Sequence, residues 1–267
     1  MSIEPWMLTL GLLNLVLLII GLFVFFPKGW FSRFRENTGY ILTGQLPWIG
    51  LIIGVVVLQL VEVHFLDSFA TALVGHDFTS AFVTVEDGAV HWFIQHWNPV
   101  LLTIFVYIYI GIYPFTLWFT PLYYVLTNQT CPIKVFALSL LFIYIIALPF
   151  YLFFPIVNVY TYYHEPSALN TVIPGINNFF YSTTTTNNCF PSLHVAMALL
   201  VFLSVTLTKN KWYKIFTGIM AGGVIISVMY LGIHWIIDVI GGAVLSISVF
   251  YLMQRRIRGP HDHPDTT

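Results

Sequence analysis

Charged residues are scarce in this sequence. Asp, Glu, Lys and Arg make up only 8% of its 267 residues, whereas 58% are hydrophobic. A soluble domain contains roughly a quarter charged residues, so this composition excludes a water-soluble fold and predicts that lipid surrounds the protein. The net charge of −1 also gives no reason to expect nucleic acid or another polyanion as a partner.

Cysteine is rarer still. The chain contains two, Cys131 and Cys189. Two cysteines cannot build a disulfide framework or a cysteine-based metal cluster, and the topology derived below places them on opposite faces of the membrane. We therefore expect two free thiols.

Long hydrophobic runs, by contrast, are abundant. A helix needs about 20 apolar residues to cross the hydrocarbon core, and its backbone groups must be satisfied within the segment. Seven stretches meet this requirement, at roughly 7–26, 45–65, 99–120, 135–155, 192–208, 215–233 and 235–253. The sequence predicts an all-α integral membrane protein, a bundle of six to seven transmembrane helices. We divide it into an N-terminal span with its loop (1–44), a membrane-embedded core (45–255) and a cytoplasmic tail (256–267).

Basic residues define the expected orientation, because cytoplasmic loops retain Lys and Arg. If the seven spans alternate, all basic residues fall on one side. They are Lys28, Arg33, Arg35, Lys134, Lys209, Lys211, Lys214, Arg255, Arg256 and Arg258. This pattern predicts an extracytoplasmic N-terminus and a cytoplasmic C-terminus. The opposite face receives the loops 66–98 and 156–191, of which the first is interpreted either as an amphipathic lid or as a segment that packs on the bundle.

Two segments on that outer face carry candidate chemistry. In the first, Pro191 and Ser192 open a span, so the free amides of its first helical turn form an anion site next to His194. In the second, His234 and Asp238 are four residues apart and share one face if the segment is helical. The carboxylate then fixes the imidazole tautomer and raises the basicity of the free nitrogen.

These residues resemble the type 2 phosphatidic acid phosphatase superfamily. Its second block, Pro-Ser-x-x-x-His or a close variant, is matched by Phe190-Pro191-Ser192-Leu193-His194, and its third block ends in His-x-x-x-Asp, as at His234 and Asp238. The short Ser-Leu-His form and the lead-in Met229-Tyr230-Leu231 are similar to the branch that contains inositol phosphorylceramide synthase. The resemblance covers about residues 99–250.

The resemblance implies a role for each residue. His234 attacks phosphorus to form a phosphohistidine, Asp238 orients that imidazole, and His194 protonates the departing alkoxide before it activates the second acceptor. Ser192, Asn188 and Tyr230 are the candidate substrate-binding residues. Neither a metal nor another cofactor is implied, and the expected partner is a phosphorylated lipid within the membrane.

One departure from the family pattern concerns positive charge. Phosphatases of the superfamily carry a Lys-x6-Arg-Pro block and an arginine six residues before the nucleophilic histidine. Here that block is missing, Val228 stands at the arginine position, and no arginine occurs between Arg35 and Arg255. Losing one such donor costs about 2.7–4 kcal/mol of transition-state stabilisation. The candidate replacements are the helix N-terminus at Ser192, the polar run 183–188, Tyr230, outer histidines when protonated, and, less favoured, a cation held by His76/Asp77 or His164/Glu165.

Three functions remain open on sequence grounds. The first is a lipid phosphate phosphatase with water as acceptor at the outer face of the membrane. The second is a lipid head-group phosphotransferase of the inositol phosphorylceramide synthase type. The third is a non-catalytic membrane protein with a decayed site. The short chain favours the phosphatase, whereas the absent arginines favour the transferase, because a phosphodiester carries less negative charge than a monoester.

Overall fold

The computed structural model describes residues 4–258, and over that range every regular element is a helix. The tail beyond Arg258, predicted to be cytoplasmic, lies outside the described residues. The elements are α1 (Pro5–Val24), α2 (Trp30–Glu36), α3 (Thr38–Val61), η1 (Glu62–Leu66), α4 (Asp67–Val74), α5 (Thr79–Glu86), α6 (Ala89–Gln95), α7 (Pro99–Tyr107), η2 (Ile108–Ile112), α8 (Tyr113–Leu126), α9 (Thr130–Phe153), α10 (Val159–Tyr162), α11 (Ala168–Val172), α12 (Ile176–Phe180), α13 (Leu193–Val205), α14 (Lys211–Tyr230) and α15 (Ile236–Arg258).

The predicted all-α membrane fold is confirmed. Within residues 4–258, six helical runs are long and apolar enough to cross a membrane, and α13 is a shorter apolar helix. The six runs are Pro5–Val24, Ile41–Val74, Pro99–Leu126, Thr130–Phe153, Lys211–Tyr230 and Ile236–Arg258. Each predicted span therefore has a counterpart. Both the second and the third run longer than expected. The π-helical turn η1 joins α3 to α4 at the predicted end of the second, and α8 carries the third on to Leu126.

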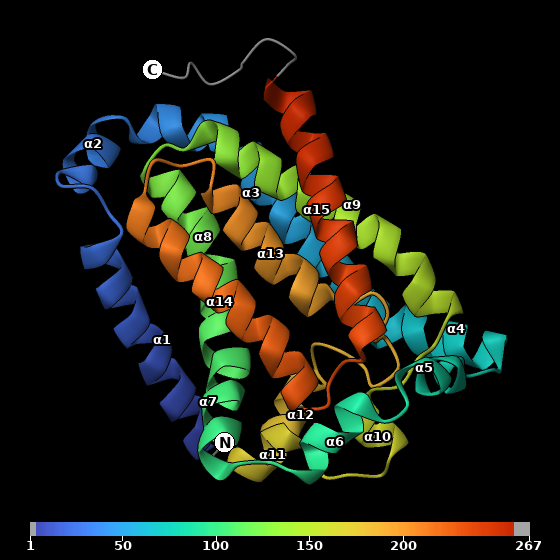
Figure 1. Cartoon of the computed structure of the whole chain (residues 1–267). Helices are drawn as coiled ribbons and strands as arrows, with labels where there is room; N and C mark the ends of the chain where they lie inside the picture. The colour runs from blue at the N-terminus through green and yellow to red at the C-terminus, as the bar shows by residue number, and fades with distance from the viewer. Residues whose placement is uncertain (1–3, 259–267) are drawn as a thin grey trace.

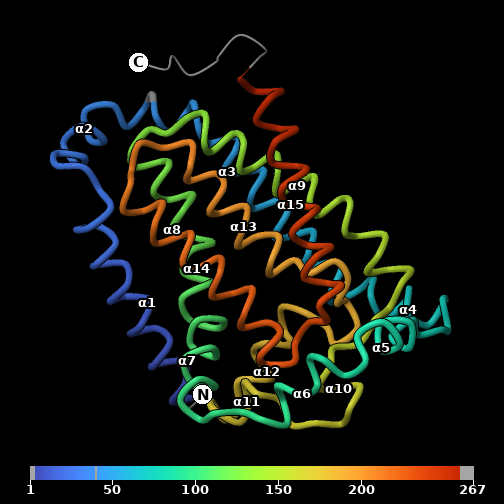
Figure 2. Tube along the Cα trace, viewed as in Figure 1, coloured from blue at the N-terminus to red at the C-terminus, as the bar shows by residue number. Residues whose placement is uncertain are grey.

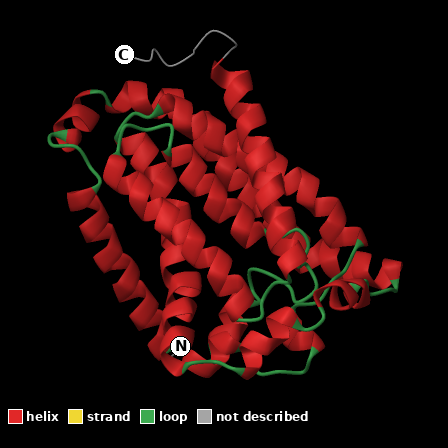
Figure 3. Cartoon of the chain, viewed as in Figure 1, coloured by secondary structure: helices red, strands yellow, loops and turns green. Residues whose placement is uncertain are grey.

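The helices pack side by side and leave the loop-rich end of the bundle opposite the end of α15 (Figures 1 and 3). The basic residues lie in and just before α2, at the start of α9, around the α13–α14 loop and in the last turns of α15, and these segments gather at one end of the traced chain (Figure 2). The two histidine segments lie toward the other end. This arrangement agrees with the alternation that we used to predict orientation.

Close packing at glycine ties the start of α13 to α15. A β-carbon at Gly242 would collide with the carbonyl oxygen of Ser192, and one at Gly241 would lie 2.6 Å from the Phe190 ring. The amide of Ser192 also donates to the carbonyl of Asp238 at 3.0 Å. Small residues on α15 therefore allow the two histidine-bearing segments to meet.

The segment predicted to be either a lid or a packing element is helical and packs on the bundle. Val90 and Ile94 of α6 are buried in the core, and Ile94 lies directly against Gly232. Phe82 of α5 packs on Phe190, with ring centroids 5.8 Å apart. Helix α6 thus packs against the turn between α14 and α15, and α5 packs against the segment that leads into α13.

Candidate active site

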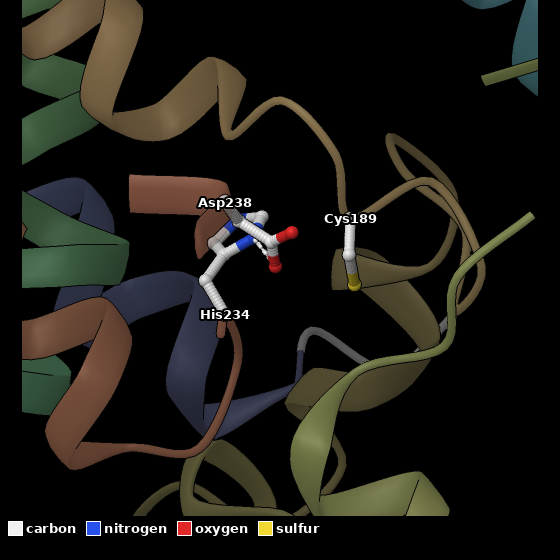
Figure 4. A group of neighbouring side chains, drawn as sticks. All are labelled: Cys189, His234 and Asp238. Carbon is white, nitrogen blue, oxygen red and sulfur yellow. Dashed lines mark hydrogen bonds and ion pairs between the residues drawn. The ribbon is translucent and has the colours of Figure 1, made fainter. Parts of the chain in front are cut away.

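His234 lies in a turn rather than in a helix. Residues 231–235 connect α14 to α15, and Gly232 adopts a φ of 68° there. Asp238, in the first turn of α15, reaches back so that its Oδ2 accepts from the amide of Trp235 at 2.9 Å and lies 3.3 Å from Nδ1 of His234. Figure 4 shows the two side chains facing each other. The expected contact is present, but helix capping rather than a shared helix face produces it.

His194 meets His234 directly. Ser192 caps α13, since its hydroxyl accepts from the amide of Val195 at 3.4 Å, and His194 follows as the second helical residue. Its Nδ1 lies 3.2 Å from Nε2 of His234. Two residues that are 40 positions apart in sequence therefore form one pair, as a two-histidine mechanism requires.

Tyr109 extends this pair and was missed by the sequence analysis. Its hydroxyl lies 2.8 Å from Nε2 of His194, and its side chain is buried. Tyr109 belongs to the π-helical turn η2, a feature that often marks functional sites. In the sequence it is one of 15 tyrosines in an apolar chain, so nothing local distinguished it from an interfacial residue.

The four side chains allow one consistent assignment of protons. Tyr109 donates to Nε2 of His194, Nδ1–H of His194 donates to Nε2 of His234, and Nδ1–H of His234 donates to Asp238. We assign these tautomers from the network. The result is a lone pair on Nε2 of His234 and a proton on the neighbouring nitrogen of His194.

Burial keeps His234 neutral. The residue is 4% exposed, and desolvation of the charged imidazolium lowers the pKa of His234 to about 3. A neutral imidazole is the form that can attack phosphorus, so the site holds its candidate nucleophile in the reactive protonation state at neutral pH.

A cavity of about 580 Å³ opens in front of the two histidines. Both apolar and polar side chains line it. The apolar and aromatic residues that matter here are Trp6, Leu10, Tyr109, Tyr113, Phe179 and Phe180, and the polar ones are Gln59, Glu62, Asn158, Thr183, Thr184, Thr185 and Asn188. Within the described residues no Lys or Arg lines the cavity, and Glu62 contributes a carboxyl group. The shortage of positive charge seen in the sequence thus persists in the folded site.

Glu86 of α5 accepts a hydrogen bond from the start of α15, next to the turn that carries His234. Its Oε1 accepts from the amide of Ile237 at 2.9 Å, which is one of the free amides at the start of α15. Burial raises the pKa of the Glu86 carboxyl above its ordinary value. In the sequence Glu86 lies within the predicted outer loop 66–98, and no local pattern marks it, because its partner lies 151 positions away.

The three predicted substrate-binding residues occupy different places. Asn188 lines the cavity. Ser192 is fully buried as the cap of α13. Tyr230 lies outside the cavity wall, where its hydroxyl accepts from the amide of Asn98 at 2.8 Å and its ring packs on Phe105. The structure therefore brings only Asn188 of these three to the same described cavity as the histidines.

The candidate cation ligands of the outer loops do not converge. Glu165 contacts His91 at 2.9 Å, and Asp77 accepts from the amide of Thr79 at 2.7 Å. A different group, Cys189, His234 and Asp238, brings its ligand atoms within 4.8 Å of one another (Figure 4). Burial raises the pKa of the Cys189 thiol, which favours the protonated form and opposes metal ligation.

Comparison with protein families gives this geometry a context. A family model described as the PAP2 superfamily matches residues 79–252, which is more than half of the chain. The chain therefore belongs to the PAP2 superfamily, whose members catalyse phosphoryl transfer or hydrolysis. The matched region begins with α5 and ends within α15, so it contains both histidines. No curated protein and no solved structure matches the chain.

Proposed function

We propose that this protein transfers the phosphorylated head group of a membrane lipid through a phosphohistidine on His234. The observation that carries the proposal is the hydrogen-bonded series Tyr109, His194, His234 and Asp238 at the wall of a 580 Å³ cavity. It combines a neutral nucleophile, a neighbouring proton donor and an orienting carboxylate, which are the parts that covalent phosphoryl transfer needs.

The first step forms the phosphohistidine. Nε2 of His234 attacks phosphorus, and the bond from phosphorus to the lipid oxygen breaks. His194 gives its Nδ1 proton to the departing alkoxide while its Nε2 takes the hydroxyl proton of Tyr109, so that His194 stays neutral. The phosphorus takes the place of the present hydrogen bond between the two imidazoles. Asp238 offsets the positive charge that develops on His234.

The second step releases the product. The free Nδ1 of His194 accepts a proton from the hydroxyl of the acceptor, whose oxygen attacks phosphorus, and Nε2 of His194 returns its proton to Tyr109. The phosphorus–nitrogen bond breaks and its electron pair returns to His234. The amides of Leu193 and His194, in the first turn of α13, lie where a phosphate oxygen could accept from them.

The charge of the cavity favours a phosphodiester over a phosphate monoester. A monoester carries nearly two negative charges, whereas a diester carries one, and the described wall of the cavity offers Glu62 and no Lys or Arg. A second candidate is lipid phosphate phosphatase. It is supported by the hydroxyl groups of Thr183, Thr184 and Thr185, which line the same cavity as the histidines and can hydrogen-bond an acceptor water.

One experiment separates these functions. Purified protein in lipid nanodiscs receives phosphatidic acid or diester lipids with labelled head groups, together with a lipid alcohol. Head-group transfer without free phosphate supports the proposal, and phosphate release from phosphatidic acid supports the phosphatase. Both activities, and an acid-labile phosphohistidine, should vanish in His234→Ala and persist in His96→Ala, which alters an exposed histidine outside the cavity. Full activity in His234→Ala would contradict the mechanism.

We also propose that the site faces the extracytoplasmic side, because the basic residues lie at the opposite end of the bundle. Single cysteines at the exposed positions Thr84 and Lys209 test this orientation in intact cells. A membrane-impermeant maleimide should label Thr84→Cys and not Lys209→Cys. The reverse pattern would place the site on the cytoplasmic side.

A further inference from the structure

Glu62 is a buried carboxyl group that the proposed chemistry does not use. It is 2% exposed, begins the π-helical turn η1 at the end of α3, and lines the same cavity as His194 and His234. An ionisable side chain within a membrane segment is costly and is usually retained for function.

Two neighbouring side chains donate hydrogen bonds to the Glu62 carboxyl group. Nδ2 of Asn188 donates to its Oε1 at 2.6 Å, and the hydroxyl of Tyr144 donates to its Oε2 at 3.4 Å. One turn earlier, Gln59 donates to the carbonyl of Thr183 at 3.5 Å. These bonds tie the end of α3 to the loop that leads into His194, so the position of Glu62 relative to the histidines is fixed.

Asp67 provides a contrast within the same helical run. It is also buried, and it accepts from Asn187 at 3.4 Å, the residue before the partner of Glu62. Asp67 does not line the described cavity, however, whereas Glu62 does. If both carboxyl groups were purely structural, substituting either one should have the same effect. Of the two, Glu62 lines the cavity and can therefore contact a ligand.

The charge of Glu62 selects what it meets. A carboxylate repels the oxygens of a phosphate, and in the described lining neither Lys nor Arg offsets it. It attracts groups that donate hydrogen bonds, and such charge-assisted bonds are the strong ones. We propose that Glu62 and Asn188 form a subsite for a hydrogen-bond donor, a hydroxyl or an ammonium group, on the head group that stays attached to phosphorus.

This inference rests on the proposed head-group transfer and names its substrate class. The preferred donors are diester lipids whose head group ends in O–H or N–H. A diester with the same acyl chains and a methyl head group lacks the donor and should be a poor substrate.

The test uses phosphatidylglycerol, phosphatidylethanolamine and phosphatidylmethanol with identical acyl chains. Wild type should turn over the first two about tenfold faster in kcat/KM than the third, the scale of one hydrogen bond to a charged group. Glu62→Ala should remove this preference, so that the three lipids have equal kcat/KM values. Glu62→Gln, which keeps an acceptor oxygen but no charge, should retain the preference for a hydroxyl and lose it for an ammonium group. Asp67→Asn is the matched control and should keep the wild-type ratios.

Two results overturn the subsite. One is an equal loss on all three lipids in both Glu62 variants, which indicates a general structural or catalytic role. The other is a wild-type enzyme that is indifferent to the head group. If wild type transfers nothing, the proposed function fails, and equilibrium binding of the three lipids by native mass spectrometry decides the subsite separately. Preferential retention of the two donor lipids, abolished in Glu62→Ala, supports it there, and equal retention refutes it.

Discussion

The cavity is lined by two parts of the chain, one inside and one outside the region that matches the family. The side with Tyr109, His194 and His234 lies within residues 79–252, the part that matches the PAP2 superfamily. The side built by α1 and by the end of α3, with Trp6 and Glu62, lies before that region. We propose that the two sides have different roles: the family-matched region carries out the chemistry, and the helices before it select the lipid.

The largest effect is expected at Asp238, the carboxylate that contacts His234 within the region that matches the family. Asp238→Asn should lower kcat by about 10³–10⁴-fold, because an amide that donates to Nδ1 of His234 reverses its tautomer and places the proton on Nε2. Single-turnover kinetics would show the loss in the phosphorylation step. An activity within tenfold of wild type would show that Asp238 does not set the tautomer.

Tyr109→Phe should lower kcat by about 10- to 100-fold, since it removes the hydroxyl that fixes His194, with KM little altered. Tyr113→Phe is the matched control. Its hydroxyl meets only the weakly accepting sulfur of Met197 at 3.7 Å in the described structure, so steady-state kinetics should be near wild type. Equal effects of the two substitutions would refute a specific role for Tyr109.

The packing that joins the histidine segments can be tested at glycine. Gly242→Ala should destabilise the protein by about 1–3 kcal/mol and reduce activity, because its methyl group meets the carbonyl of Ser192. Gly222→Ala, whose added carbon meets nothing within 4 Å, should have neither effect. Thermal unfolding in detergent compares them, and similar midpoints for both variants would contradict the packing argument.

Glu86 adds a pH dependence to the family side. Burial raises its pKa in the folded state, so ionisation is less favourable there than in the unfolded chain. Stability should therefore fall as pH rises from about the ordinary glutamate value through the raised pKa. Glu86→Gln should remove this dependence, and Glu36→Gln, an exposed position, should retain it. Parallel curves of unfolding midpoint against pH for Glu86→Gln and wild type would refute the sign.

The smallest effect is expected at Trp6, on the side of the cavity that lies before the family-matched region. Trp6 of α1 lines the cavity and packs on Phe179, with ring centroids 5.3 Å apart. Trp6→Ala should raise KM by about three- to tenfold and leave kcat unchanged, because it removes apolar contact area rather than a reacting group. A fall in kcat with constant KM would place α1 in the chemistry and end the proposed division.

Periodicity and composition predicted much of the fold. The seven spans follow from local runs of apolar residues, and the segments of His194 and His234 were found because short polar motifs stand out in an apolar chain. The lengths of the second and third spans were underestimated, because an apolar run does not fix where a helix ends: η1 continues the second span into α4, and the third ends only at Leu126. The assignment of Ser192 and Tyr230 to substrate contact remains a prediction, and the structure gives both side chains other partners.

By itself the sequence determined that the chain inhabits a membrane, which end of the bundle carries positive charge, and which two segments hold histidines. All three follow from the identity and spacing of neighbouring residues. Tertiary structure alone decided that Tyr109 reaches His194 over 85 positions and that Glu62 reaches Asn188 over 126. Such contacts depend on how helices pack and where π turns rotate a side chain. They bring the Tyr109 hydroxyl and the Glu62 carboxyl group to this site, and no local pattern in the sequence predicts them.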